Sequence, residues 1–274
     1  MQMACWLLHV LGSIKEEGEE VSIDLEWSEA QVREFEEKGY LLFRGAVDPE
    51  RCDAIREVAA VHLKHRIPPV ELESEYIGID REVYRRTIRR LRQVHRRDIL
   101  FREWMEEPEI RPLLARLLGE MPILVTAHHN SIMTKMPKTS TRTRWHRDQR
   151  YWHYRDRRLL SVWLALGREE SQNGVLEFIP GSHRMEFPPE AFDEKEFFRD
   201  DYAPNREWID KRESFVLEKG DLILFHASLL HQAGSNGSDT PKFSLVYTVR
   251  AAGNLPLEGT RSSLYEEIPL PPLD

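Results

Sequence analysis

The chain has 274 residues, of which 39 are Lys or Arg and 47 are Asp or Glu, so its formal net charge is -8. This negative charge argues against general nucleic-acid binding, and without any stretch of eighteen apolar residues the chain has no candidate membrane-spanning helix. The two cysteines, Cys5 and Cys52, are most simply free thiols in a reducing compartment, so we expect a cytoplasmic protein.

The first residues form a short apolar run from Met3 to Leu11. It lacks the basic residues and the cleavage site of a secretory signal peptide. Two interpretations stay open: a packed N-terminal turn, or a weak interfacial anchor that brings the protein to the inner membrane surface.

Helices dominate the predicted structure up to about residue 120. Caps, apolar periodicity and turn residues predict helices at 29–38 (after an N-cap at Ser28), 48–64, 81–97 (after a loop at 78–80) and 108–118, with one short strand at 40–43.

The predicted helix at 81–97 carries eight arginines against one glutamate. Apolar residues at helical spacing make it amphipathic, with a basic outer face. That face is either a solvated surface balanced by acidic neighbours, or a surface that attracts phosphate, CoA or an anionic lipid head group.

From residue 121 onward the pattern changes to strands separated by turn residues. The predicted strands are 122–135, 142–148, 159–166, 175–179, 215–218, 221–225 and 243–249. We therefore expect one domain over 1–274, with a helical part at about 25–120 and a barrel core at about 121–250. The connection at 186–213 is long, charged and aromatic. It is either a lid over the site or a surface insertion that never touches substrate.

A possible metal site lies in the segment Trp-His-Arg-Asp at 145–148. His146 and Asp148 are two residues apart, and such residues on a strand point to the same side. The distant His231 could complete two imidazoles and one carboxylate, the facial set of non-haem Fe(II) oxygenases. Taken alone, the pair is more simply explained as a surface His and Asp on a polar strand.

Four segments in order resemble the phytanoyl-CoA dioxygenase family of Fe(II)/2-oxoglutarate oxygenases. They are 145–152 (WHRDQRYW), 161–166 with 173–176 (SVWLAL, NGVL), 179–184 (IPGSHR) and 219–236, which runs from KGDLILFH to LHQAGSN. The segment at 28–45 also resembles the family's opening, so the resemblance covers roughly residues 25 to 250.

The resemblance implies that His146, Asp148 and His231 bind iron, with 2-oxoglutarate as co-substrate and O2 as oxidant. It also implies a double-stranded β-helix, a jelly-roll barrel of the cupin kind, so the expected fold is mainly β with a helical cap. A carboxylate at Asp148 favours hydroxylation, because a small residue there would leave room for a halide.

The family usually has an Arg eleven residues after the second His, which binds the far carboxylate of 2-oxoglutarate. Here that position is Lys242, and Ala233 stands where the family often has Ser. Lys cannot form the bidentate fork of Arg, although it still supplies charge. We therefore expect 2-oxoglutarate to bind, with contacts from Lys242, Lys135, Thr143 and the apolar wall of Trp163.

Two further residues are predicted to contact substrate: Gln149 and Arg144. Arg144 has the same strand parity as His146, so we expect it to point into the barrel. A buried Arg needs a partner, which is either a carboxylate of the substrate or a carboxylate of the protein.

Two functions remain open. The first is hydroxylation of an unactivated C–H bond in an anionic small molecule or a lipid-linked sugar, with the Kdo sugar of lipopolysaccharide or an acyl-CoA as candidates. The charged insertion and the lack of an aliphatic channel favour the sugar. The second is a metal-binding barrel of the same fold that has lost 2-oxoglutarate use. The sequence leaves the oligomeric state open.

Overall fold

The computed structural model describes residue 23 and residues 25–272. The apolar run from Met3 to Leu11, and Cys5 within it, lie outside the described residues. Cys52 is a buried free thiol. No helix in the described part of the chain is both long and apolar enough to cross a membrane.

Capping residues mark the two ends of the first helix. Helix α1, Glu29–Lys38, starts at Ser28, whose side chain accepts a hydrogen bond from the Gln31 backbone N–H, and stops at Gly39 with φ of 87°. A side chain at Gly39 would also collide with His183, because its Cβ would lie 2.4 Å from the ring. The other helices are α2 (Pro49–Lys64), α3 (Glu73–Ile77), α4 (Glu82–Arg86), α5 (Ile99–Met105), α6 (Arg111–Leu118) and α7 (Arg206–Ile209).

In the described part of the chain all strand pairs are antiparallel, and the strands form two sheets. The larger sheet has the order β1-β9-β6-β11-β4-β3-β2, with β12 also paired to β4, and the smaller has the order β5-β10-β7-β8. The strands are β1 (Tyr40–Phe43), β2 (Val70–Leu72), β3 (Ile88–Arg92), β4 (Pro122–Lys135), β5 (Thr143–His146), β6 (Leu159–Ala165), β7 (Leu176–Phe178), β8 (Glu213–Ser214), β9 (Leu222–His226), β10 (His231–Ala233), β11 (Lys242–Ala251) and β12 (Ile268–Pro269).

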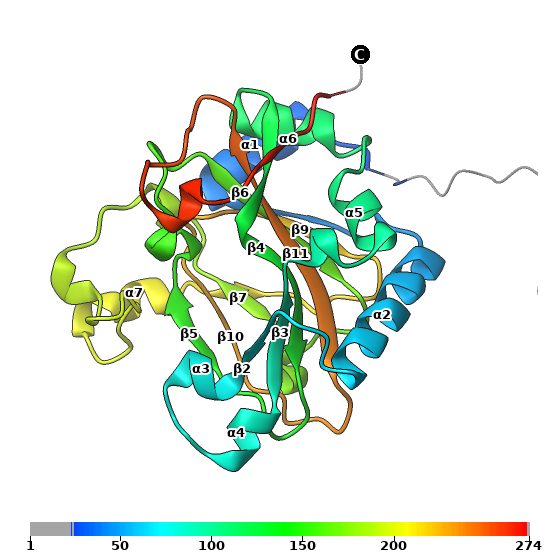
Figure 1. Cartoon of the computed structure of the whole chain (residues 1–274). Helices are drawn as coiled ribbons and strands as arrows, with labels where there is room; N and C mark the ends of the chain where they lie inside the picture. The colour runs from blue at the N-terminus through cyan, green and yellow to red at the C-terminus, as the bar shows by residue number, and fades with distance from the viewer. Residues whose placement is uncertain (1–22, 24, 273–274) are drawn as a thin grey trace, which may run out of the picture.

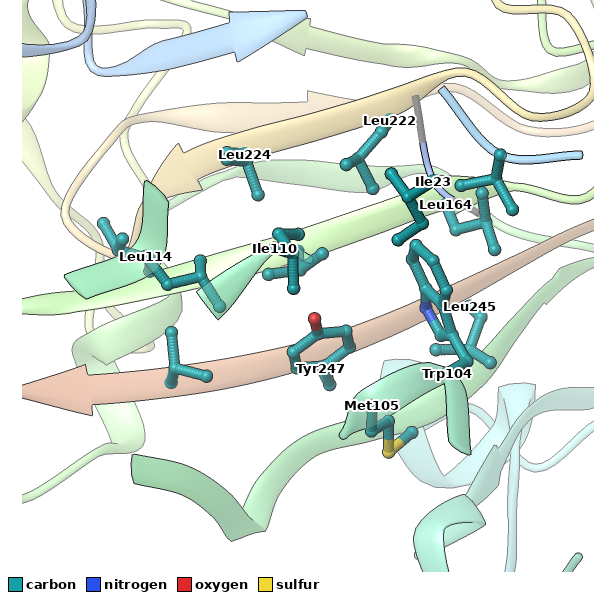
Figure 2. Packing of buried hydrophobic residues seen from close by; sticks show 14 of the residues in the cluster. Ile23, Trp104, Met105, Ile110, Leu114, Leu164, Leu222, Leu224, Leu245 and Tyr247 are labelled. Atoms are coloured by element: carbon teal, nitrogen blue, oxygen red, sulfur yellow. The ribbon is translucent and has the colours of Figure 1, made fainter. Parts of the chain in front are cut away.

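The larger sheet is buried on both faces. On one face Leu164, Leu245 and Tyr247 pack against Trp104 and other helical side chains (Figure 2). On the other face the alternate residues Trp163, Ile223, Phe225 and Val246 pack against Leu176 and Phe178 of the smaller sheet. This arrangement of two sheets with helices outside confirms the predicted cupin-like fold, although the sheets are not closed into one barrel.

The helix predicted at 81–97 is wrong. The segment forms α4, then strand β3, then a 3-10 turn at Val94–Arg96. Pairing of β3 with both β2 and β4 overrides the helical spacing of its apolar residues. As a result, Arg89 is buried and bound to Glu73 instead of lying on a basic outer face.

The structure differs from expectation in two further places, the predicted helical part and the strand predicted at 215–218. Strands β2 and β3 and helix α5 arise within the part predicted as helical, with β3 joining the sheet at β4 (Figure 1). The strand predicted at 215–218 is reduced to a single bridge between Leu217 and Glu169. The insertion at 186–213 contains short helical turns, and its aromatic side chains pack on Trp145 and Leu230.

Candidate metal centre and active site

The three predicted metal ligands converge in the structure. His146 ends β5 and lies directly opposite His231, the first residue of β10. Asp148 follows just beyond the strand, in a 3-10 turn. Its Oδ1 lies 3.6 Å from His146 Nε2 and 3.5 Å from His231 Nε2, and all three side chains are buried. Their ligand atoms lie within 4.8 Å of one another.

Backbone carbonyls orient both imidazoles. His146 Nδ1 is 2.8 Å from the carbonyl oxygen of Arg144, and His231 Nδ1 is 3.0 Å from that of Leu229. A carbonyl only accepts, so Nδ1 carries the hydrogen and the Nε2 lone pair faces the shared point. Burial lowers the pKa of His146 to about 3, which keeps this ring in the neutral form that binds metals.

The second carboxylate oxygen of Asp148 is held from the other side. Ser161 Oγ donates to Oδ2 at 3.1 Å, and His129 Nδ1 lies 3.3 Å from the same oxygen. Burial raises the pKa of Asp148, but the neighbouring histidines outweigh it and hold that pKa well below its usual value. Oδ1 of the ionised carboxylate is therefore directed toward the two Nε2 atoms.

His129 reaches this position because β4 is irregular. Along the β4–β11 ladder Tyr247 pairs with Asn130, but the next residue, Thr248, pairs with Val125. Residues 126–129 are therefore extra, and this bulge places His129 over Asp148. Two imidazoles and one carboxylate that leave three positions open fit Fe(II).

A cavity beside His231 contains every residue predicted to bind 2-oxoglutarate. Lys135, Lys242, Thr143 and Trp163 all line it, together with Arg89 and apolar side chains. The structure thus brings the predicted co-substrate residues together next to a metal ligand; their roles remain predictions.

Lys242 already has an anionic partner. Its Nζ lies 2.7 Å from Oε2 of Glu169, and both side chains are almost fully buried. Oε1 of Glu169 accepts hydrogen bonds from Ser244 Oγ at 2.6 Å and from Trp163 Nε1 at 3.2 Å. The position of the family's Arg is therefore occupied by one half of a buried ion pair.

A second, larger cavity of about 540 Å³ is lined by Asp148. His129 lines both cavities. Among the described residues, the charged lining of the larger cavity consists of six cationic side chains, Arg89, Arg90, Arg92, Arg150, Lys195 and Arg261, and three acidic ones, Glu71, Glu75 and Asp148.

The expectation that Arg144 points into the barrel is wrong. Its side chain is exposed and donates to Asp193 of the insertion at 2.7 Å. The cause is a bulge: His231 pairs with His146, but Ala233 pairs with Thr143, so three steps along β5 match two along β10. The bulge shifts the alternation, and Thr143 faces the cavity in place of Arg144.

Gln149 lies beside the metal ligands without lining either cavity. Its side-chain oxygen accepts a hydrogen bond from Ser228 Oγ at 2.6 Å. The predicted contact of Gln149 with substrate therefore has no support from this arrangement.

Sequence reasoning missed three residues of the site: His129, Arg150 and Glu169. The adjacent histidines at 128 and 129 in a predicted strand were a usable signal, because paired imidazoles in a strand place one on each face. The sequence contains no comparable signal for Glu169. It resembles an ordinary charged turn residue, and only the fold brings Lys242 beside it.

A profile of the phytanoyl-CoA dioxygenase family matches residues 35–244, about three quarters of the chain. The chain belongs to this family. It is therefore a non-haem iron, 2-oxoglutarate-dependent dioxygenase, and Fe(II), 2-oxoglutarate and O2 are its expected cofactors.

Individual relatives are distant. The phytanoyl-CoA dioxygenase domain-containing protein 1 of Mus musculus is 22% identical over 90% of this chain and 98% of its own length. The peroxisomal phytanoyl-CoA dioxygenase of Rattus norvegicus is 25% identical over 75% of this chain but only 63% of its own length. The epimerase SnoN, solved with Fe3+, alpha ketoglutarate and nogalamycin RO, shares the fold with a TM-score of 0.68 at 21% identity, covering 90% of this chain and 95% of SnoN.

Proposed function

We propose that this dioxygenase hydroxylates an unactivated C–H bond of a small anionic molecule, with an acidic sugar, free or lipid-linked, as the leading candidate. His146, Asp148 and His231 hold the iron in this proposal. The enzyme is expected in the cytoplasm, at the inner membrane surface where its substrate is lipid-linked.

The chain's own residues divide the work between the two cavities. When bound, Fe(II) with 2-oxoglutarate and O2 supplies the oxidation, inserting one oxygen atom into the C–H bond and releasing succinate and CO2. His146, His231 and Asp148 fix the metal through their carbonyl and hydroxyl partners. Trp163 and the other apolar residues of the smaller cavity exclude water from the oxoacid.

The observation that carries the substrate class is the set of cations in the larger cavity that have no carboxylate partner among the described residues: Arg92, Arg150, Lys195 and Arg261. Nη1 of Arg150 is buried and makes no hydrogen bond to the described residues. Its guanidinium is instead packed over the ring of Phe197, 4.0 Å from the centroid. Arginine presents a donor fork that suits a carboxylate or phosphate.

The rest of the lining favours a polar substrate over an acyl chain. Beside the charged groups it presents hydroxyl and imidazole groups, and its apolar side chains include Met133, Trp152 and Phe197. Sugars combine many hydroxyls with apolar ring faces that pack on aromatic side chains, whereas an acyl chain needs a continuous apolar channel.

The test is succinate release that depends on Fe(II) and 2-oxoglutarate, with an acidic sugar, its neutral counterpart and an acyl-CoA as candidate substrates. We expect only the acidic sugar to stimulate release. Arg150→Gln should raise its KM about tenfold or more, because a charge-assisted hydrogen bond is lost. Arg199→Gln is the matched control, since Arg199 is a half-buried arginine outside the lining of the larger cavity and is bound to Asp201. Equal stimulation by the neutral sugar would contradict the anionic class.

The Lys242–Glu169 ion pair favours one second candidate, a metal-binding barrel that no longer uses 2-oxoglutarate. A Lys242 that is already paired with Glu169 attracts a further carboxylate less strongly than the family's Arg would. Under this alternative the protein would bind Fe(II), but 2-oxoglutarate would leave the absorption spectrum of the bound metal unchanged in the absence of oxygen.

A further inference from the structure

The co-substrate cavity contains three cationic side chains, Arg89, Lys135 and Lys242, all of them buried. Arg89 binds Glu73, which is fully buried, at 3.2 Å. Lys242 binds Glu169 at 2.7 Å. Within the described part of the chain Lys135 has no carboxylate within ion-pair distance, so it is the basic side chain of this cavity that lacks an anionic partner.

The pair of Lys242 and Glu169 is complete in itself. Oε2 of Glu169 accepts from the ammonium group, and Oε1 accepts from Ser244 and Trp163. Both carboxylate oxygens are thus satisfied inside the protein. A second carboxylate brought to Lys242 would lie beside Glu169 and be repelled by its like charge.

Lys135 differs from Lys242 in what surrounds it. The two residues are direct partners in the β4–β11 ladder, so both enter the cavity from the same end of the sheet. Nζ of Lys135 donates to the carbonyl of Thr141 at 2.6 Å and lies 3.4 Å from Oγ1 of Thr143. Both acceptors are neutral, and an ammonium group has three hydrogens to donate.

The electrostatics of Lys135 favour a bound anion. Burial, together with the nearby charges of Arg89 and Lys242, lowers the pKa of Lys135 well below its usual value. A carboxylate placed beside it would reverse this effect and stabilise the ammonium form. Thr143 would add a hydroxyl to the same carboxylate, since the bulge in β5 turns it into the cavity.

We infer that Lys135, with Thr143, binds the distal carboxylate of 2-oxoglutarate, and that Glu169 keeps Lys242 as a structural ion pair. The inference rests on the use of 2-oxoglutarate in the proposed function. It moves the carboxylate contact from β11, where the family's pattern puts it, to the facing residue of β4.

The experiment is an anaerobic titration of the Fe(II)-loaded protein, followed by the visible charge-transfer absorption that an oxoacid produces on the metal. The two ligands are 2-oxoglutarate and 2-oxopentanoate, which has the same chain length but no distal carboxylate. The readout is the ratio of their dissociation constants. A mutation that only disturbs the fold weakens both ligands and leaves this ratio unchanged.

We expect wild type to prefer 2-oxoglutarate, and Lys135→Met to reduce that preference about tenfold or more, the loss of one charge-assisted bond. Lys135→Arg should retain most of it. The double variant Lys242→Met/Glu169→Gln removes both charges of the pair together, and it should keep the preference within about twofold. Lys138→Met is the control, because Lys138 is an exposed lysine near the same β4 end and pairs with Asp239.

A tenfold loss of preference in the double variant, or an unchanged preference in Lys135→Met, would overturn the inference. Failure of the proposed function has a different signature. In that case neither oxoacid changes the absorption of the Fe(II) protein, whereas a misassigned lysine leaves the absorption change with 2-oxoglutarate intact.

Discussion

The two cavities that meet at the metal ligands are both rich in cations, but they differ in how those cations are satisfied. In the smaller cavity Arg89 and Lys242 each have a buried carboxylate partner, and among the described residues only Lys135 lacks one. In the larger cavity Arg92 and Arg150 have none among the described residues. Arginine and lysine therefore serve either the fold or ligand binding. Whether the side chain has a carboxylate partner within the protein decides between the two.

This difference follows from the cost of burying charge. An unpaired ion in a dry interior is strongly unfavourable, so a buried cation needs an anion, supplied by the protein or, as inferred for Lys135, by the ligand. A cation at an open cavity can stay hydrated until a ligand replaces the water. Unpaired arginines at such a surface are thus candidates for ligand binding, whereas paired ones are part of the fold.

The largest expected effect comes from Asp148, the metal ligand that lines the larger cavity. Asp148→Ala removes the only carboxylate of the triad, so iron binding and turnover should both fall to background. Bound iron and succinate release are the measurements, and circular dichroism checks the fold. Asp239→Ala is the control, because Asp239 is almost fully exposed. Wild-type iron content in Asp148→Ala would mean that the triad is misassigned.

The second prediction compares a paired and an unpaired arginine of the same strand. Arg89→Gln leaves Glu73 buried without its cation, so the free energy of unfolding should fall by about 3–5 kcal/mol. Arg92→Gln leaves no such charge, and the change should stay within about 0.5 kcal/mol. Urea denaturation measures both. Equal losses of unfolding free energy in the two variants would show that a carboxylate partner does not distinguish structural cations from ligand-binding ones.

The fold and the triad could be predicted from the sequence because their signals are short-range or carried by whole motifs. His146 and Asp148 lie in one continuous segment that resembles the family, and His231 lies in another. The strands at 122–135 and 159–166 were likewise predicted within one residue of their observed ends, because their patterns extend over many residues.

The errors arose where a long-range partner decides the outcome. β3 exists because β2 and β4 lie on either side of it, and nothing within 81–97 shows this. One bulge against β10 was enough to exchange the orientations of Arg144 and Thr143. Glu169 becomes part of the site only through Lys242, 73 residues away.

The third prediction concerns His129, which lines both cavities and lies 3.3 Å from Oδ2 of Asp148. His129→Gln should weaken Fe(II) binding about 10–100-fold, since groups that position a metal ligand have effects of this size. Competition with a chelator measures the affinity. His128→Gln is the control, because His128 also packs on Trp152 but bonds to Ser262 and not to Asp148. An equal loss of Fe(II) affinity in both variants would show that His129 acts only through packing.

The smallest expected effect is that of Arg144, a cation that is paired but exposed. Arg144→Gln removes its bond to Asp193, and an exposed ion pair of this kind contributes at most about 1 kcal/mol to stability. Its guanidinium also lies 4.7 Å from the centroid of Phe197, which lines the larger cavity. The variant should therefore shift the insertion slightly and raise the KM for the anionic substrate about two- to threefold, with kcat unchanged. Arg199→Gln changes another arginine of the insertion, and it should leave KM at the wild-type value. A rise in KM of tenfold or more in Arg144→Gln would mean that Arg144 contacts the substrate directly. In that case the presence of a carboxylate partner would no longer distinguish structural arginines from those that bind ligands.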